Sequence, residues 1–133
     1  MKTGIVRFGY QHMAFLGPES KSAAEASECA DEQGKVWEYH DKLFASQAGE
    51  NQGAFSNDKL KKFAADLKLD TAKFNACLDS GKYSSLVENE TAAAQSMGVP
   101  STPAFLINGQ QLVGAQPFEA FQKIVESERS KKK

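Results

Sequence analysis

A chain of 133 residues is long enough for one ordinary domain and short for two. The formal net charge is −1, so no domain-wide positive field exists to hold a nucleic-acid backbone. The longest strictly apolar runs have four residues, far short of the roughly 20 that span a bilayer. Polar residues and glycines interrupt the first 11 residues, so no signal peptide is visible. Composition therefore predicts a globular domain without a membrane span and without a nucleic-acid partner.

The first residues alternate in polarity and predict a β-strand over residues 4–11. Val6, Phe8 and Tyr10 recur at a spacing of two, which places them on one apolar face. Gly17 and Pro18 then break the pattern.

Five helices are expected after this strand, over residues 19–33, 35–47, 57–67, 71–80 and 83–97. Ser56 and Asp70 are the expected N-caps of the third and fourth helices. Glycines at 34, 81 and 98 are the expected stops. Two apolar sets are expected to face the core: Leu60, Phe63, Ala64 and Leu67 in the third helix, and Val36, Trp37, His40, Leu43 and Phe44 in the second.

The last third of the chain predicts a hairpin followed by a closing helix. Residues 102–108 are apolar and extended, Asn108-Gly109 is a two-residue turn signal, and residues 111–114 can pair back. Pro117 is suited to the start of a helix, and the chain ends in a polar lysine tail.

Pro103 stands directly before the expected hairpin strand. A proline there removes one amide donor and exposes the preceding backbone for pairing with an extended peptide. Judged from the residues alone, the general rarity of cis X-Pro bonds favours a trans bond.

The block from Gly98 to Gly109, with Gly114 and Phe118 downstream, resembles the Gly-Val-x-x-Thr-Pro-x-Phe-x-x-Asn-Gly block of disulfide oxidoreductases of the DsbA type. The segments at 6–10, 23–35, 37–41 and 74–82 are also similar, so the resemblance extends from about residue 4 to residue 124. It implies an α/β thioredoxin-like fold with a helical insertion. The thioredoxin part would be residues 1–18 and 98–128, the insertion residues 19–97, and the polar tail residues 129–133.

The same resemblance implies functional expectations. The Thr102–Pro103 bond would be cis, and Thr102 and Pro103 would bind substrate, beside a redox dithiol. Substrates would be cysteine-containing proteins or peptides, a redox partner protein is possible, and the family works in the periplasm or elsewhere outside the cytoplasm.

One departure from this family is large. The Cys-x-x-Cys motif and its strand, which the family places before the segment at 4–11, are missing, so no catalytic thiol is present. We expect a fragment or truncated form of an oxidoreductase, with a natural short form as the other possibility. Strand edges left unpaired would be filled by the segment at 4–11 or by a second copy of the chain.

Two rival functions remain open. One is a non-catalytic thioredoxin-fold module that binds peptides. The other is the related branch of kappa-class glutathione transferases and hydroxychromene-carboxylate isomerases, against which Thr102 argues because that branch usually carries Val there.

Cys29 and Cys77 are the only cysteines, and each stands on an apolar helix face. A disulfide between them would close a loop of about 49 residues and stabilise the fold by roughly 4 kcal/mol. The alternatives are two buried reduced thiols or a redox-active pair.

His12 and His40 lack the neighbouring ligands that a metal site needs, so neither a metal nor another cofactor is expected. His40 and the single Trp37 are expected at the core, and Glu88 and Glu90 on a solvated helix face.

Overall fold

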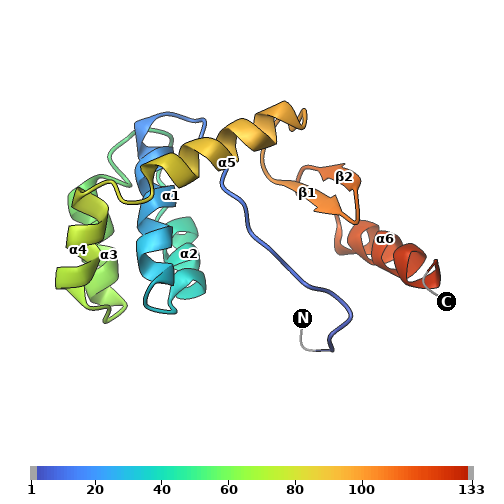
Figure 1. Ribbon diagram of the computed structural model, residues 1–133, viewed down its shortest axis with the longest axis horizontal. Helices are drawn as coiled ribbons and strands as arrows, with labels where there is room; N and C mark the ends of the chain where they lie inside the picture. The colour runs from blue at the N-terminus through green and yellow to red at the C-terminus, as the bar shows by residue number, and fades with distance from the viewer. Residues whose placement is uncertain (1–2, 132–133) are drawn as a thin grey trace. The chain divides into compact units, whose positions relative to one another are not determined.

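The computed structural model describes residues 3–131, which form six α-helices and two β-strands (Figure 1). The elements are α1 (Pro18–Asp31), α2 (Val36–Ala45), α3 (Asn57–Asp66), α4 (Thr71–Asp79), α5 (Ser84–Ser96), β1 (Ala104–Ile107), β2 (Gln110–Val113) and α6 (Phe118–Ser130). None of the helices in this range is both long and apolar enough to cross a bilayer. The chain divides into two units, one of residues 12–92 and one that joins residues up to 11 with those from 93 onward.

The first unit is a helical bundle with one continuous core. Helices α1 to α4 pack together, and α1 contacts each of the other three (Figure 1). The centre of the core is Tyr39, which is fully buried and donates a hydrogen bond from its hydroxyl to the carbonyl of Leu60 at 2.8 Å. The other buried core residues are Ala26, Cys29, Ala30, Leu60, Phe63, Ala64, Leu69, Phe74, Cys77 and Leu78.

Local signals set the ends of these helices as the sequence predicts. The Asp70 carboxylate accepts a hydrogen bond from the amide of Lys73 at 3.1 Å, which caps α4. Gly34 adopts φ 67° just after α1, a conformation that favours glycine. Ser56 occupies the N-cap position of α3, although its side chain makes no capping bond there.

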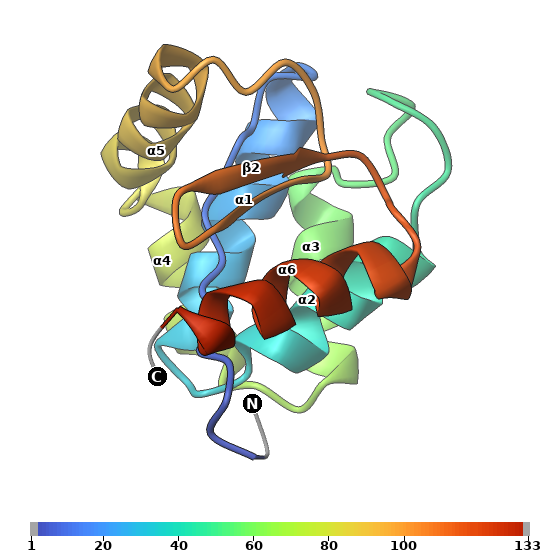
Figure 2. The same ribbon diagram turned by 90° about the vertical axis from the view of Figure 1, so that its right-hand side faces the viewer.

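The second unit contains a hairpin and α6, which lie side by side (Figure 2). Strands β1 and β2 are antiparallel, with Ala104 opposite Val113 and Ile107 opposite Gln110. Asn108 and Gly109 have φ of 48° and 89°, as a tight two-residue turn requires. Phe105 and Phe121 meet edge to face, with ring centroids 4.8 Å apart. The hairpin, its turn and the closing helix are therefore confirmed.

The prediction of a strand over residues 4–11 is wrong. The described part of this segment is irregular, and the sheet that the structure contains has only β1 and β2. Alternating side chains favour extended backbone, but a strand exists only where a neighbour supplies a hydrogen-bonded ladder. Within the residues that the structure describes, no strand ladder joins this segment to β1.

The prediction for the core face of α2 is wrong at two residues. Trp37 is 47% exposed and Phe44 is 69% exposed, while Tyr39 is the buried aromatic residue of this helix. The face that reaches the core is rotated by about one residue from the expected one, because Tyr39 inserts toward α3.

Candidate functional site

The loop that leads into β1 carries the two residues expected to bind substrate. Thr102 and Pro103 are exposed, and the peptide bond between them is cis. The carbonyl of Pro103 accepts a hydrogen bond from the amide of Gly114 at 2.7 Å. Because hydrogen-bonded pairs alternate along an antiparallel ladder, Ala104 directs its backbone groups away from β2. The outer edge of β1 thus begins at Ala104, directly after the exposed residues Thr102 and Pro103.

Glu128 ties the other end of the hairpin to α6. Its carboxylate accepts hydrogen bonds from the side chains of Asn108 at 3.2 Å and Gln110 at 2.8 Å, and pairs with Lys131 at 2.5 Å. The Lys131 ammonium, together with Asn108, lowers the pKa of Glu128. This network fixes the turn of the hairpin against the helix.

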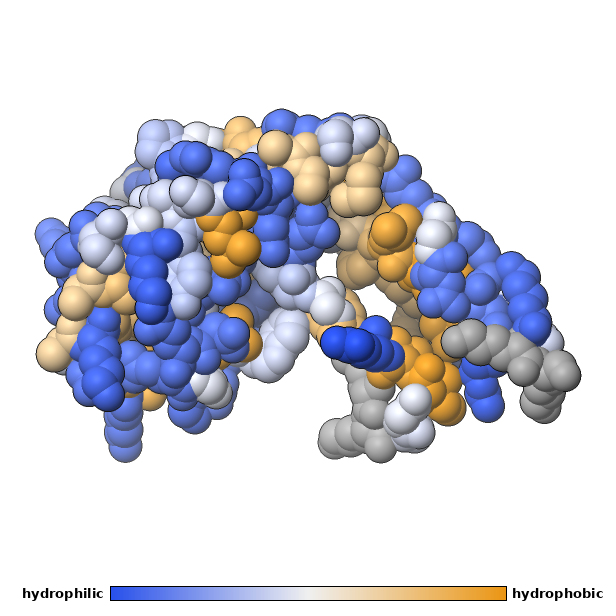
Figure 3. Space-filling model, in the orientation of Figure 1, coloured by the Kyte–Doolittle hydropathy of each residue, from blue (hydrophilic) through white to orange (hydrophobic). Residues whose placement is uncertain are grey.

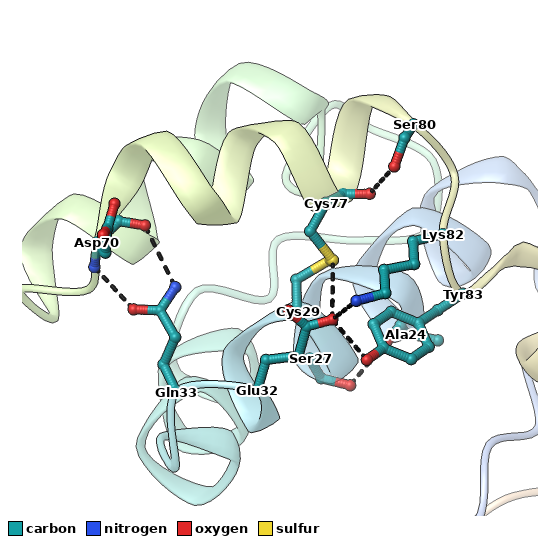
Figure 4. The surroundings of a disulfide bond; sticks show 10 residues. All are labelled: Ala24, Ser27, Cys29, Glu32, Gln33, Asp70, Cys77, Ser80, Lys82 and Tyr83. Atoms are coloured by element: carbon teal, nitrogen blue, oxygen red, sulfur yellow. Dashed lines mark hydrogen bonds and ion pairs between the residues drawn. A yellow bond between two sulfur atoms is a disulfide. The ribbon is translucent and has the colours of Figure 1, made fainter.

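A disulfide bond joins Cys29 of α1 to Cys77 of α4, with their Cα atoms 5.9 Å apart (Figure 4). Cys29 is 1% exposed and Cys77 is 7% exposed, so the bond lies in the core of the helical unit. The sequence left open whether these residues form a bond or remain thiols, and the structure contains the bond. It closes a loop that contains α2 and α3.

A polar cluster lies next to this bond (Figure 4). Glu32 directs its Oε1 atom to within 3.9 Å of Cys77 Sγ. The same oxygen pairs with Lys82 at 2.5 Å and accepts a hydrogen bond from the hydroxyl of Tyr83 at 2.6 Å. These two donors lower the pKa of Glu32, and the Glu32 hydrogen bond is the main reason why the pKa of Tyr83 is raised to about 12.

His12 is buried, although no pattern in the sequence around it predicts this. Its Nε2 atom lies 2.7 Å from the Glu28 carboxylate, and its amide donates to Glu90 at 2.7 Å. Glu90 is therefore part of an internal contact rather than of a purely solvated face. Glu88 is exposed as predicted, and it pairs with Lys21.

His40 lies at the edge of the helical unit, half-buried, beside Asp41 and between the rings of Trp37 and Phe44. Within residues 3–131, no three His, Cys, Asp or Glu side chains converge as a metal site would require.

The comparison with protein families agrees with this architecture. The family model described as thioredoxin matches residues 1–127, nearly the whole chain. The chain belongs to the thioredoxin family. A thioredoxin-like oxidoreductase from Silicibacter pomeroyi DSS-3 has the same fold, with a TM-score of 0.75, at 23% sequence identity over 91% of this chain and 67% of that one. The thioredoxin-like, DsbA-type fold that the sequence predicted is therefore confirmed.

Among curated proteins, this thioredoxin-family chain is 28% identical to disulfide bond formation protein D of Bacillus subtilis, over 94% of the chain and 58% of that protein. It is 34% identical to a Na⁺/H⁺ antiporter NhaA of Herminiimonas arsenicoxydans over 84% of the chain, and 32% identical to one of Salinispora tropica over 92%. The chain spans only 17% and 18% of these two antiporters.

Two features of the site were missed by sequence reasoning. Glu32 and Lys82 are 50 residues apart, so only the packing of α1 against the segment after α4 brings them together. The contact between His12 and Glu28 could not be predicted either, because the two residues are 16 positions apart and this spacing matches no local motif.

Proposed function

We propose that this chain is the substrate-binding and helical part of a protein thiol–disulfide oxidoreductase. The observation that carries the proposal is the exposed Thr102–Pro103 segment directly before the outer edge of β1, in a chain that belongs to the thioredoxin family. An extended peptide can pair with such an edge through main-chain hydrogen bonds, which are indifferent to peptide sequence. The similarity to disulfide bond formation protein D supports cysteine-containing proteins as the substrate class.

The chain by itself is proposed to bind and not to catalyse. Dithiol exchange needs a thiolate nucleophile, and both cysteines of this chain are in the disulfide. A non-catalytic peptide-binding module is therefore the activity of the isolated chain, and catalysis requires a Cys-x-x-Cys motif on another stretch of polypeptide. A redox partner protein would act on that motif.

Two further expectations remain proposals. The disulfide supports a location outside the cytoplasm, where such bonds persist. Pairing of the β1 edge with a second copy of the chain would give a homo-oligomer, which light scattering would detect as a concentration-dependent rise in mass.

A binding experiment tests the proposed function. The chain labelled with ¹⁵N is titrated with an unstructured cysteine-containing peptide, and with the same peptide carrying serine in place of cysteine. We expect amide shifts at Ser101, Thr102 and Ala104 with both peptides, because pairing with the backbone does not need the thiol.

Two variants at one position provide the matched control. Thr102→Ala keeps the backbone amide and should bind the peptide as the original chain does. Thr102→Pro removes that amide without touching the bond between Gly114 and Pro103, and should weaken binding roughly five- to tenfold. Equal affinity of the two variants, or shifts confined to other parts of the chain, would refute the proposal.

A further inference from the structure

The disulfide lies at the ends of two helices that carry partial negative charge. Cys29 is in the last turn of α1, which ends at Asp31, and Cys77 is in the last turn of α4, which ends at Asp79. The carboxyl end of a helix disfavours an anion. Cysteines that exchange disulfides are activated by the opposite setting, a helix N-terminus or a neighbouring cation. Both positions therefore raise the free energy of a thiolate.

Acidic side chains add to this effect. The Glu32 carboxylate lies 3.9 Å from Cys77 Sγ, and the negative charges of Glu32, Glu28 and Asp31 all act on the neighbouring Tyr83. Lys82 pairs with Glu32 and compensates one of these charges. A thiolate at Cys77, or an anionic thiol reagent approaching it, meets a carboxylate held in place by two hydrogen-bond donors.

Burial restricts how the bond can be broken. Both cysteines are buried, and Cys77, at 7% exposed against 1% for Cys29, is the one that a reductant meets first when the core opens locally. In that step the reductant's thiolate sulfur bonds to Cys77 Sγ, and the electron pair of the S–S bond passes to Cys29 Sγ. The leaving thiolate would form in the apolar core beside Ala26 and Ala30, where a charge is poorly solvated. The second thiol of the reductant then releases Cys77, so the reductant is oxidised and both cysteines end as thiols.

We propose that the negative charge of Glu32, which Lys82 and Tyr83 hold in position, slows thiol exchange at the Cys29–Cys77 disulfide. The bond therefore stays oxidised and has a structural role. This inference concerns the chain's own disulfide and does not depend on the proposed peptide-binding function. A chain that handles other proteins' disulfides would keep its own bond intact in this way.

The experiment measures reduction of the folded chain. The oxidised 133-residue chain is exposed to dithiothreitol at neutral pH, quenched by alkylation at intervals and analysed by mass spectrometry. We expect one intact disulfide at the start, and reduction at least about a hundredfold slower than in concentrated urea, because exchange needs a rare opening of the core.

Two variants, one that removes a negative charge and one that removes a positive charge, separate an electrostatic effect on the disulfide from steric shielding of it. Glu32→Gln removes the negative charge but keeps an oxygen that accepts from Tyr83, and should speed reduction roughly three- to tenfold. Lys82→Gln removes the compensating cation and leaves Glu32 uncancelled, so it should slow reduction by a similar factor. Glu38→Gln, on α2 and paired with Lys35, makes the same change in net charge elsewhere and should leave the rate unchanged.

The outcomes decide the proposal. Acceleration by Glu32→Gln, slowing by Lys82→Gln and an unchanged control support it. Acceleration by both variants would mean that the cluster only covers the bond, and the proposal would be rejected. Free thiols in the untreated chain, or reduction as fast when folded as when unfolded, would also reject it. Circular dichroism of each variant before reduction verifies that the rates refer to folded protein.

Discussion

Tyr39 and Trp37 are two positions apart on α2 and have opposite environments, since Tyr39 is fully buried and Trp37 is about half exposed. Helical spacing correctly marks α2 as amphipathic. It does not decide between two overlapping stripes, because Val36 and Leu43 belong to both of them. The choice is made by Tyr39, whose hydroxyl finds the Leu60 carbonyl while its ring packs on Phe74. Burial accordingly raises the pKa of the Tyr39 phenol. Such a contact between helices has no signature within α2 itself.

Truncation of two of the three aromatic residues of α2, Tyr39 and Phe44, should give very different losses of stability. Tyr39→Ala removes a buried ring and leaves a cavity, so we expect a loss of about 3 to 5 kcal/mol in the free energy of unfolding. Phe44→Ala affects a ring that is 69% exposed and should cost less than about 1 kcal/mol. Urea denaturation followed by circular dichroism measures both. Equal losses would contradict the orientation of α2.

Acid should weaken the contact between Glu32 and its two donors. Lys82 and Tyr83 lower the pKa of Glu32 below its ordinary value of 4.5, so the contact favours the folded state above pH 4.5. That contribution is lost as the pH falls from 4.5 through the lower pKa of the folded chain. The midpoint temperature of thermal denaturation, measured across this pH range, should fall less steeply for Glu32→Gln than for the original chain. Parallel curves would show that Glu32 does not contribute to the acid sensitivity.

At the scale of whole elements, the helices were predictable and the first strand was not. Helix ends are determined by local residues, such as the N-cap Asp70 and the glycine at position 34, and the Asn108-Gly109 turn determines its hairpin in the same way. Residues 4–11 have strand-like alternation, but pairing depends on another segment that no local pattern can supply. The place of Thr102 and Pro103 next to the first strand of the hairpin followed from sequence, although that strand begins at Ala104 and not at Thr102. The Glu32 cluster required the packing of distant segments.

Removal of the link between α1 and α4 should destabilise the helical unit. In the chain-entropy model, closing a loop of about 49 residues contributes about 4 kcal/mol, a large share of the 5 to 15 kcal/mol typical of a domain. The double variant Cys29→Ala and Cys77→Ala should lose about that amount in urea denaturation. The original chain in excess reductant and denaturant provides the comparison without substitution. A change below about 1 kcal/mol would show that packing alone holds the helices.

The whole molecule distributes its buried surface unevenly. Among residues 3–131, all buried hydrophobic residues except Ala94 lie within residues 12–92, and α6 has no buried residue. On the face seen in Figure 3, orange residues gather over the hairpin, whereas the helical unit is mostly blue. The helical unit contains far more buried apolar side chains than the other unit, so its elements should be the more stable ones.

Hydrogen exchange measures that difference. Amides of α1, α3 and α4 should be protected far longer than those of β1, β2 and α6, by about tenfold or more, because opening the second unit exposes little apolar surface. Addition of a peptide that pairs with the β1 edge should slow exchange in the hairpin selectively. Uniform protection across both units would mean that the chain unfolds as one cooperative body.

The disulfide also changes how the chain responds to a cut. Glu50 is exposed between α2 and α3, inside the loop that Cys29 and Cys77 close. A single cleavage after Glu50 by a glutamate-specific protease would sever the backbone but not the molecule. The two pieces would migrate together on a denaturing gel and separate only when reductant is added. Such a nicked chain would be a two-chain protein, and its halves could be exchanged or labelled independently.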